Sequence, residues 1–265
     1  MTPVVAWRTW ADTVPPPARV RLEVPGWGGE PNDYADAQPW HCKPFIDACS
    51  RGIELRWGLA ATVVVRGDGQ SARLEGAEAT QLNRDRTISQ FAPGHYGISS
   101  HHALRMPQGW AGLVLPHPAW SMDPYNSDLP AIIPGLIELD WWPELFFVVS
   151  RVPPEGILHR YVYGRAFCQV IPVPTDMPYT LEKMPAEERA AAVALESALK
   201  RHYHRIGTRS WVDRKGHPFG NMYKILSARF RRSGAVDWEG VLREVRELEA
   251  GELALAEHGA KPGAG

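Results

Sequence analysis

Two carboxylates stand two positions apart in a strongly apolar stretch of the sequence, "PGLIELDWWPELFFVVSR" at residues 134–151. Successive side chains of a strand point to opposite faces, so Glu138 and Asp140 are expected to share one face. Carboxylates near a core are costly unless hydrogen-bond donors or a cation satisfy them. We therefore predict that this strand borders a functional pocket.

Two kinds of chemistry suit this pair, and a structural role competes with them. A carboxylate held in an apolar pocket can act as a general base on water. In that case Glu138 is the base and Asp140 is its partner. Alternatively, the pair holds a divalent cation through its oxygen atoms. In a structural role, one acid accepts backbone N–H bonds at a bulge or pairs with an arginine such as Arg105.

Ligand contacts are predicted from one arginine and two tryptophans. Arg105 is expected to hold or orient an anionic group, and Trp110 and Trp141 are expected to stack on a planar ligand. The competing interpretation places these tryptophans, with Trp120 and Trp142, in the core or at a subunit interface. Trp141 and Trp142 are adjacent, which predicts that one faces inward and the other outward.

Four histidines lie between residues 95 and 117, namely His95, His101, His102 and His117. His95 and His101, with Glu138, would supply the two-histidine, one-carboxylate set of non-haem iron enzymes. Their spacing matches no metal motif, so ordinary core or surface histidines are the alternative. The cofactor that this hypothesis implies is a divalent metal ion.

Composition excludes several classes of partner. The chain has 265 residues, 44% of them hydrophobic, and a formal net charge of −1. Such a chain buries a substantial core and offers no general attraction for nucleic acid or an anionic membrane. There is no apolar run of about 18 residues and no signal-peptide pattern, so we expect no membrane partner and a cytoplasmic location. An odd number of cysteines, three, fits a reducing compartment.

The elements that position these residues change in character along the chain. Residues 1–39 are rich in Pro and Gly and predict an extended arm. Residues 40–175 contain short apolar runs bounded by Gly or Pro, which is typical of an antiparallel sandwich or barrel. Residues 176–258 predict a helical extension, with Asp237 placed to cap its last helix. Residues 259–265 are predicted to be disordered.

Two motif series are similar to known families. The first resembles a bacterial family of unknown function, in which the same short motifs follow one another in the same order. The matching positions are Arg105, Pro107 and Gly109, then Gly135, Glu138, Asp140 and Trp141, then Gly164 and Cys168. This resemblance covers about half of the chain and brings no established activity.

The second series is similar to trimeric dUTPases and dCTP deaminases. "GISSHHALRMPQGWAGLVLP", "IPGLIELDWWPELFFVVSRV" and "YGRAFCQVIPVP" follow the order of strand motifs in those enzymes. Gly135, Glu138 and Asp140 fall on their glycine and two acids, and Gln169 falls on a motif glutamine. The resemblance implies a mainly β fold, a distorted antiparallel β-barrel of the dUTPase-like β-clip type with a C-terminal α-helical extension. By analogy it also implies a homo-oligomer.

The sequence departs from that family where its phosphate motif is expected, because "HPAWSMDP" stands there, and it lacks the Gly-rich C-terminal arm. Hydrolysis of dUTP itself is therefore disfavoured. The leading hypothesis is an enzyme acting on a small-molecule substrate, hydrolytic or metal-assisted. One alternative is a non-catalytic binding or assembly protein with a Trp-rich surface, and another is a non-haem metal oxygenase.

Overall fold

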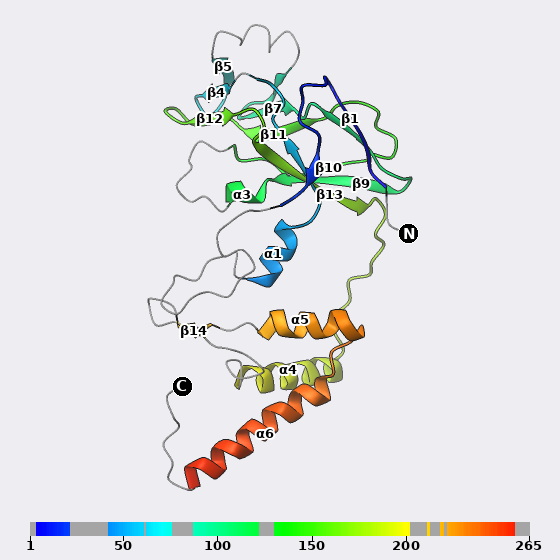
Figure 1. Ribbon diagram of the computed structural model, residues 1–265, viewed down its shortest axis with the longest axis vertical. Helices are drawn as coiled ribbons and strands as arrows, with labels where there is room; N and C mark the ends of the chain where they lie inside the picture. Colours follow the sequence, from blue (N-terminus) through cyan, green and yellow to red (C-terminus); the bar gives the residue numbers. More distant parts are fainter. Residues whose placement is uncertain are drawn as a thin grey trace. The chain divides into compact units, whose positions relative to one another are not determined.

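The computed structural model describes residues 4–21, 42–60, 62–75, 87–121, 130–201, 211–212, 218–219 and 222–257. Contacts divide the chain into two units. The first contains residues 1–23 and 47–178, and the second contains residues 24–46 and 179–265. Strands dominate the described part of the first unit, and helices dominate that of the second (Figure 1).

The largest sheet has five antiparallel strands in the order β10-β9-β13-β3-β2. Their bounds are β2 Ala18–Arg19, β3 Ile53–Arg56, β9 Trp110–Pro116, β10 Gly135–Ile137 and β13 Ala166–Pro174. β13 is the central strand because it pairs with β9 along one edge and with β3 along the other. Two short helices, α1 (Lys43–Cys49) and α3 (Pro118–Ser121), precede β3 and follow β9.

Three smaller sheets complete the described strands of the first unit. A ribbon pairs β1 (Ala6–Thr9) with β8 (His102–Arg105). The order β11-β7-β6 joins Phe147–Arg151, His95–Ser99 and Ile88–Ala92. The order β12-β4-β5 joins Leu158–Tyr161, Val63–Gly67 and Ala72–Glu75.

One apolar core joins these sheets. Its largest fully buried side chains include Trp57, Tyr96, Tyr161 and Phe167. Alternation along the strands explains the packing, since every second side chain of β4 is buried while its neighbours are partly exposed. Cys168 lies in the same core, and burial raises the pKa of its thiol.

The expectation of a mainly β chain with antiparallel sheets is confirmed, but that of a distorted antiparallel barrel is not. The described strands form separate sheets, and none of these closes on itself. The sequence also missed β1, which lies inside the segment predicted to be an extended arm. "AWRT" becomes a strand only because it pairs with residues 102–105, far away in the sequence. The rest of that arm (22–39) and the tail (259–265) lie outside the described residues.

The second unit contains α4 (Ala186–Arg201), α5 (Met222–Ser233), α6 (Trp238–Glu257) and a short pair, β14 (Trp211–Val212) with β15 (Pro218–Phe219). Asp237 caps α6 as predicted, since its Oδ1 accepts the Gly240 N–H at 2.9 Å. Val241 is the buried centre of a small core.

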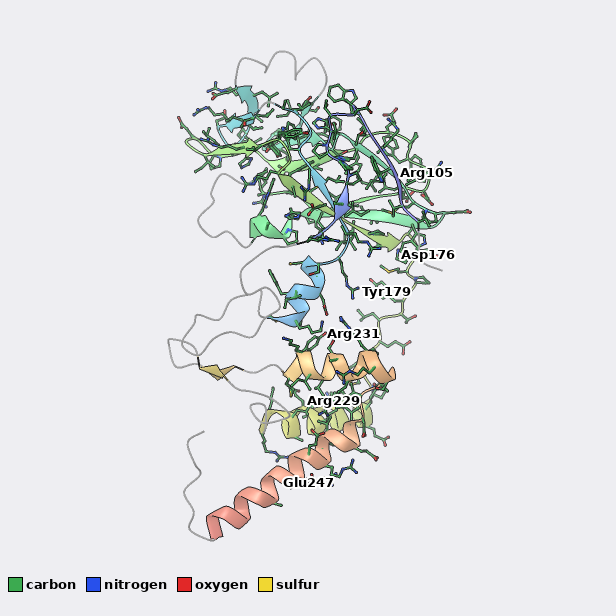
Figure 2. All side chains as sticks on the ribbon, viewed as in Figure 1. Arg105, Asp176, Tyr179, Arg229, Arg231 and Glu247 are labelled. Carbon is green, nitrogen blue, oxygen red and sulfur yellow. The ribbon has the colours of Figure 1, made fainter. Side chains whose placement is uncertain are left out.

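Arg229 of α5 donates to both carboxylate oxygens of Glu244 on α6, at 3.2 and 3.3 Å, which ties these two helices together. Figure 2 labels Arg229 on α5 and Glu247 on α6. Within the described residues, none of the helices has the length and apolar character needed to cross a membrane.

Candidate functional site

The strand that leads into the two acids ends earlier than the sequence predicts. β10 stops at Ile137, and residues 139–141 form a turn. Leu139 is fully buried and packs closely on Gly112 of β9, where an added Cβ would lie only 2.6 Å from the Leu139 Cδ1. The Leu139 carbonyl also accepts the Met106 N–H at 2.9 Å. The residue between the two acids therefore anchors the turn to the core.

The prediction that Glu138 and Asp140 share one face of a core strand is wrong, because neither residue lies in a strand. Glu138 is exposed, and its Oε2 accepts a hydrogen bond from Trp141 Nε1. Asp140 is half-buried, and its Oδ2 accepts the Gly109 N–H at 2.9 Å. Its Oδ1 is buried without a hydrogen-bond partner in the described part of the chain. Glu138 thus orients an indole, while Asp140 keeps one acceptor oxygen unused.

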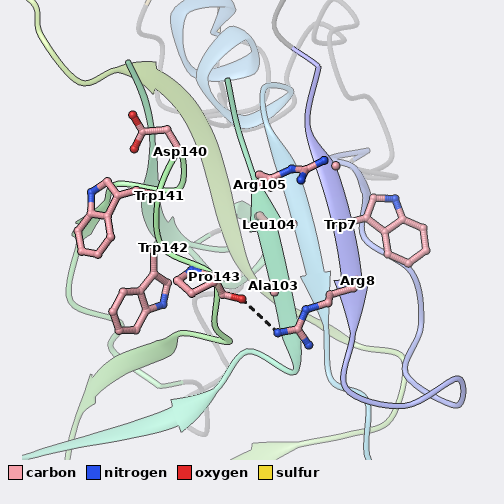
Figure 3. A pocket seen from close by; sticks show the side chains of 10 residues that line it. Trp7, Arg8, Ala103, Leu104, Arg105, Asp140, Trp141, Trp142 and Pro143 are labelled. Carbon is pink, nitrogen blue, oxygen red and sulfur yellow. Dashed lines mark hydrogen bonds between the residues drawn. The ribbon is translucent and has the colours of Figure 1, made fainter. Parts of the chain in front are cut away.

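A pocket of about 360 Å³ opens beside Asp140, between the β1–β8 ribbon and residues 140–143 (Figure 3). Ala6 lies opposite Arg105 in the ribbon, and Arg8 lies opposite Ala103. Because directly opposed residues of an antiparallel pair share a face, these four side chains point to the same side of the ribbon. The volume is within the roughly 300–1,000 Å³ of small-molecule sites.

Two guanidinium groups border this pocket. Arg8 Nη2 donates to the Pro143 carbonyl at 3.1 Å, which ties the ribbon to the loop (Figure 3). Arg105 is exposed, and its side chain makes no hydrogen bond or ion pair with any residue that the structure describes. The structural alternative, in which Arg105 pairs with one of the two acids, is therefore not observed. A guanidinium in this state can bind a carboxylate or a phosphate through two parallel hydrogen bonds.

Trp141 and Trp142 form an apolar wall of the pocket. Their ring centroids are 5.7 Å apart with an interplanar angle of 85°, and their exposed fractions are 63% and 36%. Both face outward, whereas the sequence predicted that one of them would face inward. In Figure 3 both indoles lie on the opposite side of the ribbon from the indole of Trp7. Their exposure leaves large flat surfaces open to a ligand.

The third predicted contact, Trp110, does not line this pocket. It is the first residue of β9, is half-buried and packs against the main core. Trp120 is also part of that core. The core interpretation therefore describes these two tryptophans, and the ligand-stacking interpretation remains open for Trp141 and Trp142 only.

The histidines do not meet at one site. His95 is half-buried, and its Nδ1 lies 3.2 Å from the Pro93 carbonyl. His101 is buried, with its ring centroid 5.8 Å from that of Trp10 and 4.9 Å from that of Trp57. Within the described residues, no group of three or more His, Cys, Asp or Glu is placed to hold a metal ion. The two-histidine, one-carboxylate set with Glu138 is thus not assembled.

Sequence reasoning missed a buried polar cluster around Glu54 of β3. Glu54 is 2% exposed, and its Oε1 accepts hydrogen bonds from the Arg56 guanidinium. Nε2 of the buried His117 lies 3.4 Å from Glu54 Oε2, which is within ion-pair range but long for a hydrogen bond. Burial acts to raise the pKa of Glu54, but contacts with His117 and Arg56 outweigh it and lower the pKa. The alternation in "GIELRW", with Glu54 and Arg56 on one face, was the available signal.

A second buried polar group lies inside the core. The Tyr96 hydroxyl is 2.8 Å from His159 Nδ1 and 2.9 Å from the Tyr161 hydroxyl. Burial raises the pKa of both tyrosines, so both stay protonated at neutral pH. This network satisfies polar atoms that would otherwise be costly in a core, and it borders neither the pocket beside Asp140 nor the acidic turn.

No protein-family model matches the chain, and no curated protein matches it. Solved structures that are similar include the dUTPase of Staphylococcus bacteriophage 80alpha, with 13% identity, a TM-score of 0.37, and coverage of 69% of this chain and 99% of that chain. The dUTPase from phage phi11 of S. aureus gives 12% identity, the same TM-score, and coverage of 69% and 98%.

At so low an identity and TM-score, this likeness says nothing about substrate, activity or assembly. The bacterial family of unknown function and the dUTPase-like barrel therefore stay predictions from the sequence motifs. The candidate site depends on neither, because it is defined by contacts within the first unit.

Proposed function

We propose that this protein binds a small organic anion with a flat apolar part in the pocket between the β1–β8 ribbon and residues 140–143. The observation that carries the proposal is the Arg105 guanidinium, which has no side-chain partner in the described chain and borders the same pocket as two exposed indoles. An unpaired cation beside an apolar wall suits a ligand that carries both a negative group and a ring.

Each part of the pocket has a separate role in this proposal. The anionic group of the ligand accepts hydrogen bonds from Arg105, and the ring rests on Trp141, which Glu138 orients through the indole N–H. Asp140 Oδ1 accepts a hydrogen bond from a hydroxyl or amine on the ligand. The Asp140 carboxylate also disfavours a ligand with a second negative charge at that end, because like charges repel.

Calorimetric titration with naphthoate, an aromatic monocarboxylate, tests this proposal. Arg105→Gln is expected to weaken binding by at least about tenfold, since a hydrogen bond to a charged group contributes about 1.5–3 kcal/mol. Trp141→Ala is expected to weaken binding similarly. Trp238→Ala is the matched control, because it removes an indole of 40% exposure from α6 in the other unit. Equal naphthoate affinity in Arg105→Gln and the native chain would refute the site.

A second candidate function is hydrolysis in the same pocket, with Asp140 as general base. The observation that favours it is Asp140 Oδ1, a buried acceptor without a partner in the described residues that borders the pocket. Asp140→Asn, which keeps the size of the side chain and the Gly109 contact, is expected to abolish turnover in a screen of ester and amide substrates. Turnover that persists in Asp140→Asn would exclude this role.

A metal-assisted version of that reaction has its own test. If the reaction is metal-assisted, elemental analysis of protein purified without chelators, native beside Glu138→Gln, shows near-stoichiometric metal that the variant loses. Metal content that is unchanged by this substitution would remove Glu138 as a ligand. A closed barrel and a homo-oligomer, both proposed from sequence motifs alone, are not needed for any of these experiments.

A further inference from the structure

A second pocket, of about 520 Å³, lies against the β1–β8 ribbon and has different chemistry from the first. It shares only Trp7 and Leu104 with the pocket beside Asp140. Trp7 lies opposite Leu104 in the ribbon, so both point away from the face that carries Arg8 and Arg105. Figure 3 shows the Trp7 indole turned away from Trp141 and Trp142. The ribbon therefore separates two hollows.

Two arginines and no acid line the described part of this second pocket. Arg19 comes from β2, and Arg51 precedes β3. Both are exposed, and neither side chain makes a hydrogen bond or ion pair with another described residue. In the first pocket, the carboxylate of Asp140 lies in the same lining as the two arginines. The second pocket has two positive charges and no carboxylate in its lining. It is therefore the more electropositive of the two.

The backbone that carries these arginines is held firmly. The buried Gln169 side chain donates to the carbonyl oxygens of Ala48 and Arg51. Gly52 has a φ of +83°, and a Cβ there would lie 2.5 Å from the Val170 carbonyl oxygen. The Gly52 carbonyl accepts the Val20 N–H at 3.2 Å, next to Arg19 on the neighbouring strand. The two cations thus start from fixed positions on one edge of the sheet.

The rest of the lining is apolar and partly aromatic. Val5, Ile53 and Pro172 contribute apolar surface, and Trp7 contributes an indole that is 52% exposed. An inorganic anion would contact only the two guanidiniums. The exposed indole and the apolar wall would then gain no contact from binding. A flat apolar body with two negative groups uses both features.

We propose that this second pocket is a separate binding site for a small organic dianion, such as an aromatic dicarboxylate, whose ring rests on Trp7 and whose charges contact Arg19 and Arg51. The site goes beyond the function proposed above because its cations are two other arginines, Arg19 on β2 and Arg51 before β3. It selects two negative charges, whereas Asp140 makes the first pocket select one.

Calorimetric titration with phthalate, an aromatic dicarboxylate, tests the second site in a chain whose first pocket is disabled. The background variant is Arg8→Gln with Arg105→Gln, which leaves the second pocket intact. Phthalate is expected to bind this background, and adding Arg19→Gln with Arg51→Gln is expected to weaken binding by at least about tenfold. Failure of the first pocket to bind naphthoate has no bearing on this result.

The matched control adds Arg151→Gln with Arg165→Gln to the same background. These two exposed arginines lie on β11 and in the turn before β13, and line neither pocket. The control removes the same charge and is expected to change phthalate affinity by less than about threefold. Circular dichroism and thermal unfolding of each variant confirm that it is folded. An equal loss in the control, or no phthalate binding in the background, would overturn the site.

The class of ligand is tested with two further probes in the same background. Benzoate has the ring but a single charge, and inorganic phosphate has charge without a ring. Both are expected to bind at least about tenfold more weakly than phthalate. Trp7→Ala is expected to weaken phthalate binding without changing phosphate binding. Phosphate that binds as tightly as phthalate would overturn the assignment of an aromatic dianion.

Discussion

Two regions of the first unit hold carboxylates in opposite environments. Glu54 lies on β3 of the largest sheet, is buried, accepts hydrogen bonds from Arg56 and has His117 within ion-pair range. Asp140 lies half-buried in the turn at 139–141 and lines a pocket, and the exposed Glu138 directly precedes that turn. The apolar sequence around Glu138 and Asp140 predicted that both are buried, but only Glu54 is fully buried. A carboxylate enters a core when partners come with it, and otherwise the chain turns to bring it out.

The largest effect on stability is expected from removing Glu54, the buried acid of this comparison. Glu54→Ala removes the hydrogen-bond acceptor of Arg56 and the ion-pair partner of the buried His117, and is expected to lower the free energy of unfolding by about 3 kcal/mol. Urea unfolding at neutral pH measures it. Because the folded pKa of Glu54 is lowered, its contribution is present above the unfolded pKa and is lost as pH falls through the folded value.

Glu75→Ala is the control for that experiment. Glu75 pairs with Arg66 at 2.6 Å, but both side chains are 37% exposed. Water screens such a pair, so its loss is expected to cost less than about 1 kcal/mol. Equal losses for Glu54→Ala and Glu75→Ala would show that burial does not distinguish the two acids.

A second prediction concerns the buried His101, whose ring nitrogens make no hydrogen bond with the residues that the structure describes. Burial, with a smaller contribution from the neighbouring His102, lowers the pKa of His101 to about 4 from its ordinary value of 6.5. Between these two pKa values the unfolded chain binds a proton at this histidine and the folded chain does not. The free energy of unfolding is therefore unaffected by this group above pH 6.5 and decreases as the pH falls toward 4. The shift corresponds to about 3 kcal/mol of lost stability at the acid end.

The pH dependence of unfolding in His101→Asn measures this contribution. Asparagine tolerates the φ of +57° at this position and does not titrate, so the slope between the two pKa values is expected to flatten. His95→Asn, at a half-buried position, serves as the control. If His101→Asn keeps the native slope, another group is responsible for it.

Smaller effects on stability are expected from changes at Asp140 and Glu138. Asp140→Ala removes the acceptor of the Gly109 N–H and is expected to cost about 1 kcal/mol of stability. Thermal unfolding detects a change of this size. A loss as large as that of Glu54→Ala would mean that the turn is a structural centre, and the contrast between the two regions would fail.

The smallest expected effect on stability belongs to Glu138→Gln, because this residue is exposed and its carboxylate hydrogen-bonds only the Trp141 indole among the described residues. The change is expected to be less than about 0.5 kcal/mol. Binding of naphthoate sharpens the distinction, since the carboxylate that orients the indole becomes a weaker acceptor and affinity is expected to fall by about threefold. Unchanged affinity together with unchanged stability would leave Glu138 without a role in the pocket.

The sequence by itself determined the classes of element and several of the pocket's residues. Period-two alternation bounded by Gly and Pro identified the antiparallel strands, and Asp237 marked the start of α6, because these signals depend on residues close together in the chain. Arg105, Asp140 and Trp141 were also recognised by type, and all three border one pocket.

Tertiary structure alone decided where those residues point. In the turn at 139–141, Leu139 packs against Gly112, a residue of another strand, while Glu138 and Asp140 lie outside the sheet. β1 exists only through its pairing with β8, and that ribbon forms a wall of both pockets. His117 reaches Glu54 from the end of another strand. Such contacts join positions far apart in sequence, where no local pattern of residues can encode them.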